Sequence, residues 1–306
     1  MKRKVINFIN KLPYIRGIVR DLNEYKYINR FAPGHYHNPI PNREEIENHY
    51  NSLKEEIRDI DYDFKNQEGI LTDLLPFYKE MPWDFNNDSN NKGFRYKNEE
   101  SYYRYSDAVF LYLLMRKYEP KKIIEVGSGF SSAIMLDTND LFFKDNRIKF
   151  TFVEPNPQDR LDGLINAEDR VNCQIYASKV QDVDLAIYKE LKENDILFID
   201  SSHLSKAGSD LNFILFEILP ILNKGVIIHF HDIFFPFDYP KDWLTKERFF
   251  WNECYLLRAF LMNNKDYGIV FFNSAAHKFH TDFLSKEMPE VIIDHEHCGA
   301  LWIQKK

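Results

Sequence analysis

Carboxylate and imidazole side chains gather directly after two hydrophobic stretches in the second half of the sequence. Asp200 ends the stretch DILFID, with His203 shortly after it, and the stretch GVIIHF runs into His231 and Asp232. Nitrogen and oxygen donors of this kind bind divalent metal ions. An imidazole, whose pKa is ordinarily about 6.5, can also take a proton from an attacking group. We therefore predict a divalent-metal site among these side chains, and catalytic roles for Asp200, His231 and the base His203.

Other interpretations of these residues stay open at this point. Buried histidines and aspartates at strand ends often hydrogen-bond loop backbone and do no chemistry. Two histidines and a carboxylate are also the ligands of some non-haem iron oxygenases. A third possibility is that Asp200 and Asp232 face the positive charge of a cofactor without any metal.

A glycine turn stands earlier in the chain, in the sequence KKIIEVGSGFSS (121–132). Gly127 and Gly129 permit a tight turn and a close approach of the backbone to a ligand, and the start of a following helix attracts an anion. Ser132 stands where a dinucleotide fingerprint has its third glycine, so the turn is a poor match for a nicotinamide site. By itself, such a turn is equally typical of an ordinary strand-to-helix connection.

An acidic residue follows the turn at the distance expected for a ribose ligand. Glu154 ends the stretch KFTFVE, 25 residues after Gly129, and two prolines then stop the strand. A carboxylate at the end of the second strand can accept hydrogen bonds from both ribose hydroxyls. The position of Glu154 relative to the glycine turn favours this role over that of a solvated strand end.

These residues lie at the ends of strands in a regular alternation of strands and helices. Continuous apolar strands that alternate with helices indicate a parallel sheet covered on both faces, which binds ligands beyond the carboxyl ends of its strands. The predicted strands are 122–126, 149–154, 171–176, 195–200, 225–230, 267–272 and 300–304. The predicted helices include 185–193, 208–219, 248–262 and one that starts near Ser132.

The motifs IIEVGSGFSS, FTFVEPNP, DILFIDSSH and GVIIHFHDIF, in this order, resemble the class I S-adenosylmethionine-dependent methyltransferases. More narrowly, they are similar to the bacterial branch of sugar and natural-product O-methyltransferases, over residues 100–306. The resemblance implies an α/β fold with a Rossmann-like, mostly parallel sheet of seven strands and a final antiparallel strand, GALWIQKK. It also implies S-adenosylmethionine as cofactor and methyl transfer to a hydroxyl of a sugar, nucleotide sugar or glycosylated small molecule.

The same resemblance assigns the cofactor's contacts. Its methionine part is expected against Glu125, Gly127, Ser128, Gly129 and Ser132, its ribose at Glu154, and its adenine near Gln181 and Asp182. In metal-dependent relatives, acidic or amide side chains at the strand ends hold magnesium, and Asp200, His231 and Asp232 are the matching positions. The histidine departs from that pattern, because imidazole suits manganese, iron, cobalt or zinc better than magnesium. We expect Mg²⁺ or Mn²⁺.

The first hundred residues precede the alternating pattern. They are expected to form a mostly helical elaboration (1–100), followed by the cofactor-binding methyltransferase domain (101–306). Their segment FAPGHYHNPIP (31–41) is too irregular for a helix or strand, and ordered loops of this kind often carry binding residues. We expect His35, Tyr36 and His37 to contact the acceptor.

Residues 1–12 place apolar side chains at helical spacing among lysines and an arginine. A helix of this composition can lie on an anionic membrane surface. Because the helix is short, we favour packing on its own domain or on a second subunit of a homo-oligomer.

The composition of the chain bears on which partners it binds and in which compartment it resides. The net charge of −7 repels polyanions and argues against nucleic acid as a partner. The three cysteines lack zinc-ligand spacing and the first residues lack a signal-peptide core, so a cytoplasmic protein is expected. The competing function is a binding or scaffold protein at a membrane assembly that keeps the cofactor fold but does no chemistry.

Overall fold

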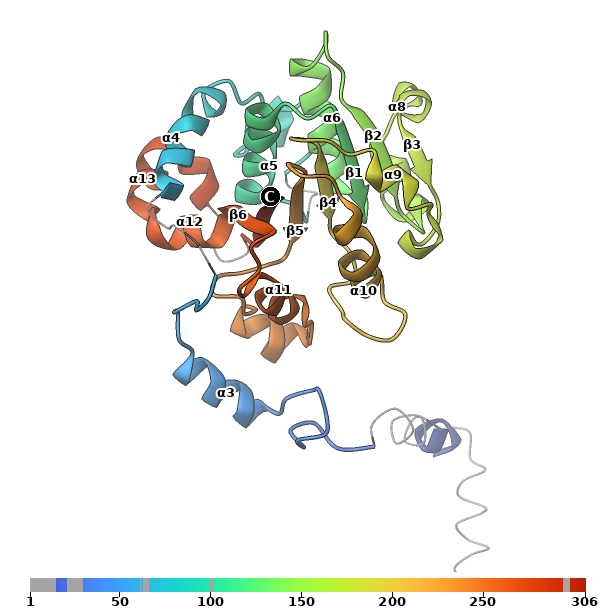
Figure 1. Ribbon diagram of the computed structural model, residues 1–306, viewed down its shortest axis with the longest axis vertical. Helices are drawn as coiled ribbons and strands as arrows, with labels where there is room; N and C mark the ends of the chain where they lie inside the picture. The colour runs from blue at the N-terminus through green and yellow to red at the C-terminus, as the bar shows by residue number, and fades with distance from the viewer. Residues whose placement is uncertain (1–14, 21–29, 61, 63–65, 99–101, 294–297) are drawn as a thin grey trace, which may run out of the picture. The chain divides into compact units, whose positions relative to one another are not determined.

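The computed structural model describes residues 15–20, 30–60, 62, 66–98, 102–293 and 298–306. Its strands are β1 (Lys122–Val126), β2 (Lys149–Val153), β3 (Gln174–Tyr176), β4 (Ile196–Ile199), β5 (Ile227–His231), β6 (Tyr267–Phe272) and β7 (Ala300–Lys305). They form one sheet in the order β3-β2-β1-β4-β5-β7-β6 (Figure 1). Strands β1 to β5 pair in parallel, and β7 pairs antiparallel with both β5 and β6. The predicted α/β fold with a Rossmann-like, mostly parallel sheet and a final antiparallel strand is confirmed.

The register of the sheet brings the carboxyl ends of four strands to one edge. Val126 pairs with Val153 on one side and with Ile199 on the other, and Ile199 pairs with Phe230. The chain leaves β1 toward β2 and later returns to β4 on its other side, so the strand order reverses between β1 and β4. Open α/β sheets bind their ligands at this point.

Helices cover both faces of the sheet. Figure 1 shows α5 and α6 on one side and α10 and α11 on the other. The α-helices are α3 (Arg43–Ser52), α4 (Asn66–Tyr78), α5 (Tyr105–Tyr118), α6 (Phe130–Phe142), α7 (Leu161–Leu164), α8 (Ala167–Asn172), α9 (Ala186–Lys189), α10 (Asp210–Phe213), α11 (Glu253–Leu261), α12 (Asn273–Phe279) and α13 (Thr281–Glu287). The shorter 3₁₀ and π turns are η1 (Asp88–Asn90), η2 (Pro157–Asp159), η3 (Val180–Asp182), η4 (Ile214–Ile218), η5 (Leu219–Ile221), η6 (Trp243–Glu247) and η7 (Pro289–Ile292).

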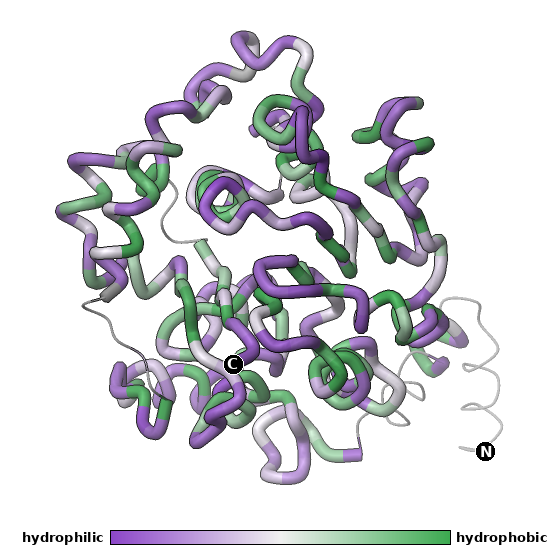
Figure 2. Tube along the Cα trace, turned by 45° about the horizontal axis from the view of Figure 1, so that its top comes forward, coloured by the Kyte–Doolittle hydropathy of each residue, from purple (hydrophilic) through white to green (hydrophobic). Residues whose placement is uncertain are grey.

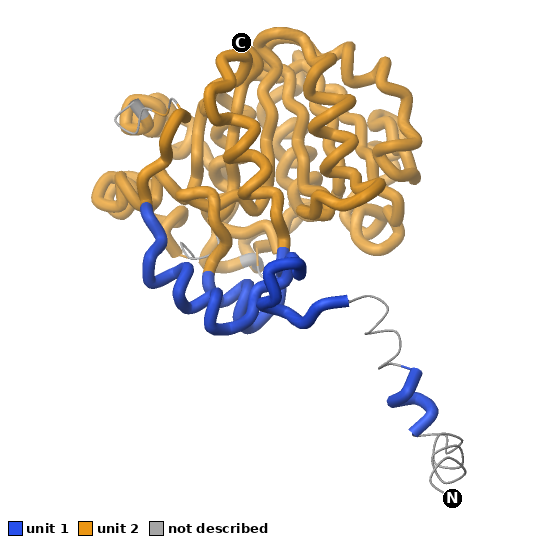
Figure 3. The backbone as a smooth tube through the Cα atoms, turned by 60° about the horizontal axis from the view of Figure 1, so that its bottom comes forward, with its two compact units in different colours: residues 1–54, 241–250 blue, residues 55–240, 251–306 orange. Residues whose placement is uncertain are grey.

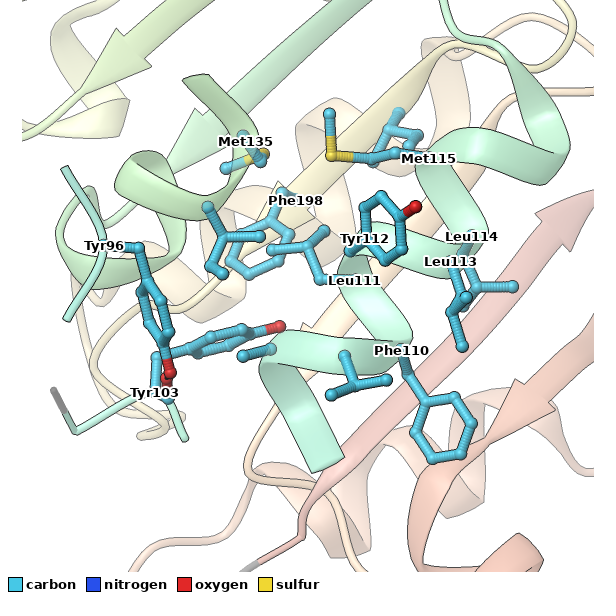
Figure 4. Packing of buried hydrophobic residues seen from close by; sticks show 14 of the residues in the cluster. Tyr96, Tyr103, Phe110, Leu111, Tyr112, Leu113, Leu114, Met115, Met135 and Phe198 are labelled. Carbon is cyan, nitrogen blue, oxygen red and sulfur yellow. The ribbon is translucent and has the colours of Figure 1, made fainter. Parts of the chain in front are cut away.

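Helix α5 lies at the centre of the core on its face of the sheet. Every residue from Ser106 to Met115 is buried, as expected for a helix that is hydrophobic on almost all sides. Figure 4 shows its side chains packed beside Met135 of α6 and Phe198 of β4. Hydrophobic residues also recur along the strands (Figure 2). The polar strand ends therefore extend from a close-packed hydrophobic core.

The elements differ from the predicted ranges at a few ends. Residues 171 and 172 close α8 and do not begin β3, because Asn166 and Asp169 form a capping box that starts a helix there. The predicted helix 185–193 is shorter, since α9 spans only Ala186–Lys189. The predicted helix 248–262 begins only at Glu253.

The chain divides into two compact units, which Figure 3 distinguishes by colour. Unit 1 comprises residues 1–54 and 241–250, and its two segments are joined by an ion pair of 2.6 Å between Lys241 Nζ and Glu47 Oε2. Unit 2 comprises residues 55–240 and 251–306 and holds the whole sheet.

Residues 55–100, which the sequence groups with the N-terminal elaboration, fall in unit 2. The predicted helix at residues 1–12, and with it a membrane or subunit contact, lies outside the described residues. None of the described helices is both long and apolar enough to span a membrane.

Candidate active site

The turn after β1 needs a glycine because the end of β4 passes very close to it. Gly127 has φ +83°, and a Cβ added there would lie 1.7 Å from the carbonyl oxygen of Asp200. The backbone of Asp200 in turn donates to the carbonyl of Val126 at 2.9 Å. Gly127 therefore lets the two strand ends meet at the switch point.

Replacement of Gly127 by alanine is expected to destabilise the protein by about 3 kcal/mol or more, since the clash with backbone adds to the strain of a positive φ. Gly208 is a matched control: its φ is +75°, but no atom lies within 4 Å of an added Cβ. Gly208→Ala should cost only about 1 kcal/mol. Urea denaturation of both variants measures the difference, and equal losses would mean that the approach of Asp200 does not dictate the glycine.

Glu125, at the end of β1, is hydrogen-bonded to the first turn of α6. It is fully buried and accepts hydrogen bonds from Ser131 Oγ, at 2.5 Å, and from Ser132 Oγ. Ser132 Oγ also accepts from the backbone of Gly129 at 3.1 Å. Burial raises the pKa of Glu125 to about 8, against the opposing effect of the two serine hydroxyls. Glu125 and Ser132 thus tie the end of β1 to the first turn of α6.

Glu154 lies directly after β2. Its Oε2 accepts from the backbone N–H of Ser128 at 3.2 Å and its Oε1 from that of Asn156 at 2.8 Å. The backbone of Glu154 donates to Tyr176 of β3 at 3.0 Å. The carboxylate is therefore held between the glycine turn and the strand end.

A cavity of about 370 Å³ opens at the strand ends. Four predicted site residues line it: Gly127, Glu154, Gln181 and Asp200. Gln181 Nε2 donates to the carbonyl of Gly208 at 3.0 Å. Asp182 lies exposed in η3 and is not among the lining residues. Lys179, Lys206, Ser209 and Asp210 also line the cavity and were not predicted.

Glu154→Ala is expected to weaken the binding of S-adenosylhomocysteine at least tenfold, because hydrogen bonds to a charged acceptor contribute about 1.5 to 3 kcal/mol each. Glu217→Ala, which removes an exposed carboxylate of η4, is the control and should leave affinity unchanged. Calorimetry measures both. Unchanged affinity in Glu154→Ala would remove this residue from the cofactor site.

The structure brings Asp200, His231 and Asp232 together. Each offers a ligand atom, and these atoms all lie within 4.8 Å of one another. His231 is buried, its Nδ1 has no hydrogen-bond partner, and its Nε2 is 3.5 Å from Asp232 Oδ1. Its ring lies 4.8 Å from that of Tyr103.

His203 stands beside this cluster and is held by a residue distant in sequence. Its Nδ1 is 2.8 Å from Glu253 Oε2, at the start of α11. Its Nε2 is 3.4 Å from Asp200 Oδ1 and 3.5 Å from Asp232 Oδ2. His203 is buried, and its ring packs against that of Trp251 at 4.3 Å. Glu253 therefore orients the imidazole so that Nε2 faces the two aspartates.

Burial and charge act against each other in this cluster. Burial lowers the pKa of each imidazole, but the carboxylates of Asp200 and Glu253 raise the pKa of His203 well above its ordinary value. In the same way, Asp232 and Asp200 raise the pKa of His231 despite its burial. Burial raises the pKa of Asp232 to about 6, although both histidines oppose this, and it also raises the pKa of Glu253. The pKa of Asp200 is lowered despite burial, chiefly by His231.

The cluster carries an excess of acidic groups. Asp107, at the start of α5, interacts electrostatically with His231 and Asp232 and joins the other three carboxyl groups. Four carboxyl groups thus face two imidazoles in this cluster, so the acidic groups outnumber the basic ones. A cation at this edge of the sheet is therefore favoured electrostatically.

The predicted acceptor residues lie in unit 1. The ring of His35 stacks on those of Phe31 and Tyr36, each at 4.3 Å, and His37 lies 4.3 Å from Tyr36. Tyr36 is 86% exposed. Their contact with an acceptor stays a prediction.

A comparison of the sequence with known protein families finds a match in the sheet region. Residues 124–233, from β1 to just after β5, match the family described as a methyltransferase domain. An uncharacterized protein of Archaeoglobus fulgidus is 33% identical over 178 residues, which is 54% of this chain and 76% of that protein.

Several solved structures are similar to the chain at lower identity. The S-adenosylhomocysteine-bound methyltransferase PaMTH1 of Podospora anserina is 17% identical, with a TM-score of 0.42 over 87% of this chain and 98% of that one. A putative caffeoyl-CoA O-methyltransferase from Staphylococcus aureus is 15% identical, with a TM-score of 0.40 over 77% and 98%. A Mg-SAM structure of cmcI-D160 is 15% identical, with a TM-score of 0.36 over 65% and 71%. At these scores the neighbours carry no argument about acceptor or metal.

The assignment rests on the family match, on the strand order with its single antiparallel strand, and on the glycine turn and Glu154 at the ends of β1 and β2. Together these identify residues 124–233 as a methyltransferase domain on a Rossmann-like sheet, as in an S-adenosylmethionine-dependent methyltransferase.

Proposed function

We propose that this methyltransferase acts on a hydroxyl oxygen of a small-molecule acceptor and that a divalent metal assists the reaction. The observation that carries the proposal is the group of His203, Asp200, His231 and Asp232 at the strand ends, where Asp200 also lines the cavity. The sugar, nucleotide sugar or glycosylated molecule as acceptor rests on the resemblance of the sequence motifs.

In the proposed reaction, the acceptor oxygen forms a bond to the methyl carbon as the bond from that carbon to sulfur breaks. The products are the methyl ether, S-adenosylhomocysteine and the proton of the hydroxyl. Positioning supplies much of the rate enhancement in such a displacement. His203 is the proposed acceptor of the proton at Nε2, because Glu253 occupies its Nδ1 at 2.8 Å.

A metal fits the cluster on three grounds. The donor atoms of Asp200, His231 and Asp232 lie within 4.8 Å of one another, the buried His231 Nδ1 lacks a partner, and the acidic groups exceed the basic ones. We propose that these three residues hold Mg²⁺ or Mn²⁺, whose contribution when bound would be to acidify the acceptor hydroxyl. The same excess of negative charge also favours a second arrangement, in which Asp200 and Asp232 face the sulfonium of the cofactor without a metal.

For the acceptor, we propose contacts from His35, Tyr36 and His37. Replacing both histidines by alanine is expected to raise the KM for the true acceptor at least tenfold and to leave the affinity for S-adenosylhomocysteine within twofold, since lost polar contacts of this kind contribute about 1 kcal/mol each. His49→Ala, in α3 of the same unit, is the control. An unchanged KM in the double variant would make the loop structural.

The test of the function is a cofactor-turnover assay with purified protein over a panel of nucleotide sugars, glycans and glycosylated small molecules. We expect formation of S-adenosylhomocysteine that depends on one class of acceptor, together with a methyl ether in that product. Cofactor binding without turnover on any acceptor would favour the scaffold function. Turnover only with acceptors that lack a hydroxyl would refute O-methylation.

A further inference from the structure

Arg160 lies over the start of α6 and contacts two aromatic rings. Its guanidinium carbon is 5.6 Å from the ring centre of Tyr102 and 5.2 Å from that of Phe130, the first residue of α6. A Cβ added to Gly129 would lie 2.7 Å from Arg160 Cδ and 3.2 Å from its Nη1. The arginine, which follows β2 and η2, therefore reaches across to the glycine turn after β1.

The guanidinium is not neutralised by the described part of the chain, where no carboxylate lies within 4.0 Å of it. Its side chain is exposed at the edge of the sheet that carries the cavity. It is near enough to Asp200 for its charge to stabilise that carboxylate. Arg160 thus presents a positive charge to the reaction edge of the sheet.

We propose that Arg160 binds the carboxylate of the cofactor's methionine part, with Tyr102 and Phe130 holding the plane of the guanidinium. Contact with aromatic rings occupies the faces of a guanidinium and leaves the N–H groups at its edge free, and these match the two oxygens of a carboxylate. The 13-residue helix α6 begins at the same place, and its first N–H groups attract the same anion.

This proposal rests on the assignment of the chain as an S-adenosylmethionine-dependent enzyme, with the methionine part of the cofactor at the glycine turn. It adds a residue that the sequence motifs do not include. Arg160 follows the strand-end Glu154 in a segment that makes a single 3₁₀ turn, η2. Only its contacts with Gly129, Tyr102 and Phe130 reveal its place.

Two ligands that differ only in the carboxylate test the proposal by calorimetry: S-adenosylhomocysteine and its decarboxylated analogue. Arg160→Met is expected to weaken the binding of S-adenosylhomocysteine at least about tenfold, the loss typical of a charged hydrogen bond. Its affinity for the analogue should stay within twofold of the parent protein. Arg160→Lys, which keeps the charge but not the planar fork, should fall between the two.

Two further variants test the aromatic contact and provide a control. Tyr102→Leu removes one ring at an exposed position and should weaken only the binding of S-adenosylhomocysteine, by about threefold. Arg147→Met, which breaks an exposed ion pair with Asp140, should change neither affinity.

Equal losses for both ligands in Arg160→Met would overturn the proposal, as would unchanged affinity combined with a raised KM for the acceptor. If the parent protein bound neither ligand, the cofactor assignment itself would be wrong. If it bound both equally, only the carboxylate site would be refuted.

Discussion

Exhaustive chelation of the purified enzyme is expected to abolish methyl transfer, and added Mn²⁺ or Mg²⁺ is expected to restore it. An alcohol is a poor nucleophile at neutral pH, whereas a bound metal can lower the pKa of a coordinated water from 15.7 to about 7 in the most favourable zinc case. A much weaker effect on a hydroxyl would still change the rate by orders of magnitude, because each 1.36 kcal/mol is a factor of about ten.

Variants of the three proposed ligands test the same point. Asp200→Asn and His231→Ala should each lower turnover by about 100-fold or more, corresponding to a loss of several kcal/mol of metal assistance. They should also weaken the binding of Mn²⁺, which calorimetry measures without acceptor or turnover. Asp162→Asn, which removes a half-buried carboxylate paired with Arg170 at 2.9 Å, is the control.

Full activity after chelation, with no metal found by elemental analysis, would contradict the metal. The carboxylates would then serve the sulfonium of the cofactor. In that case Asp200→Asn and Asp232→Asn should weaken S-adenosylmethionine, which is positively charged at sulfur, more than S-adenosylhomocysteine, which is not. The two arrangements therefore give different results with the same variants.

Sequence alone predicted the sheet well because each strand is a continuous apolar run that ends in a polar or glycine residue. All seven predicted strands exist; the third starts three residues later than expected, at Gln174, the fifth two residues later, at Ile227, and the fourth one residue later, at Ile196. The misplaced residues 171 and 172 belong to α8, since the capping box at Asn166 outweighs their strand propensity. Parallel pairing then brings the predicted residues Gly127, Glu154 and Asp200 to one cavity.

What sequence could not predict is which distant side chains complete the strand ends. Glu253 holds His203 from 50 residues further along the chain, and Asp107 acts on His231 from a helix that precedes β1. Neither contact follows a fixed spacing, because each depends on how helices pack on the sheet. For Glu125, the motif indicates its importance and the structure adds its burial and its two serine partners; its contact with the cofactor stays a prediction.

His203→Gln is expected to lower kcat by a factor of about 10² to 10⁴, the usual contribution of a positioned general base. The affinity for S-adenosylhomocysteine should remain within twofold, because His203 is not among the residues that line the cavity. Rapid-quench measurement of a single turnover separates the chemical step from product release. His280→Gln, at the start of α13, is the control.

Glu253→Gln distinguishes a base from a buried structural residue. An amide keeps the shape of Glu253 but removes the negative charge that favours a proton on His203 Nδ1. Without that charge, the tautomer in which Nε2 is free to accept a proton is no longer favoured. We expect kcat to fall by about tenfold in Glu253→Gln, and no further fall when this change is added to His203→Gln, because the two residues act as a unit. Thermal unfolding of all three variants identifies any loss that is due to stability. If the losses in kcat were additive in folded protein, Glu253 would not act through His203. If kcat of His203→Gln stayed within threefold of the parent protein, a group other than His203 would take the proton.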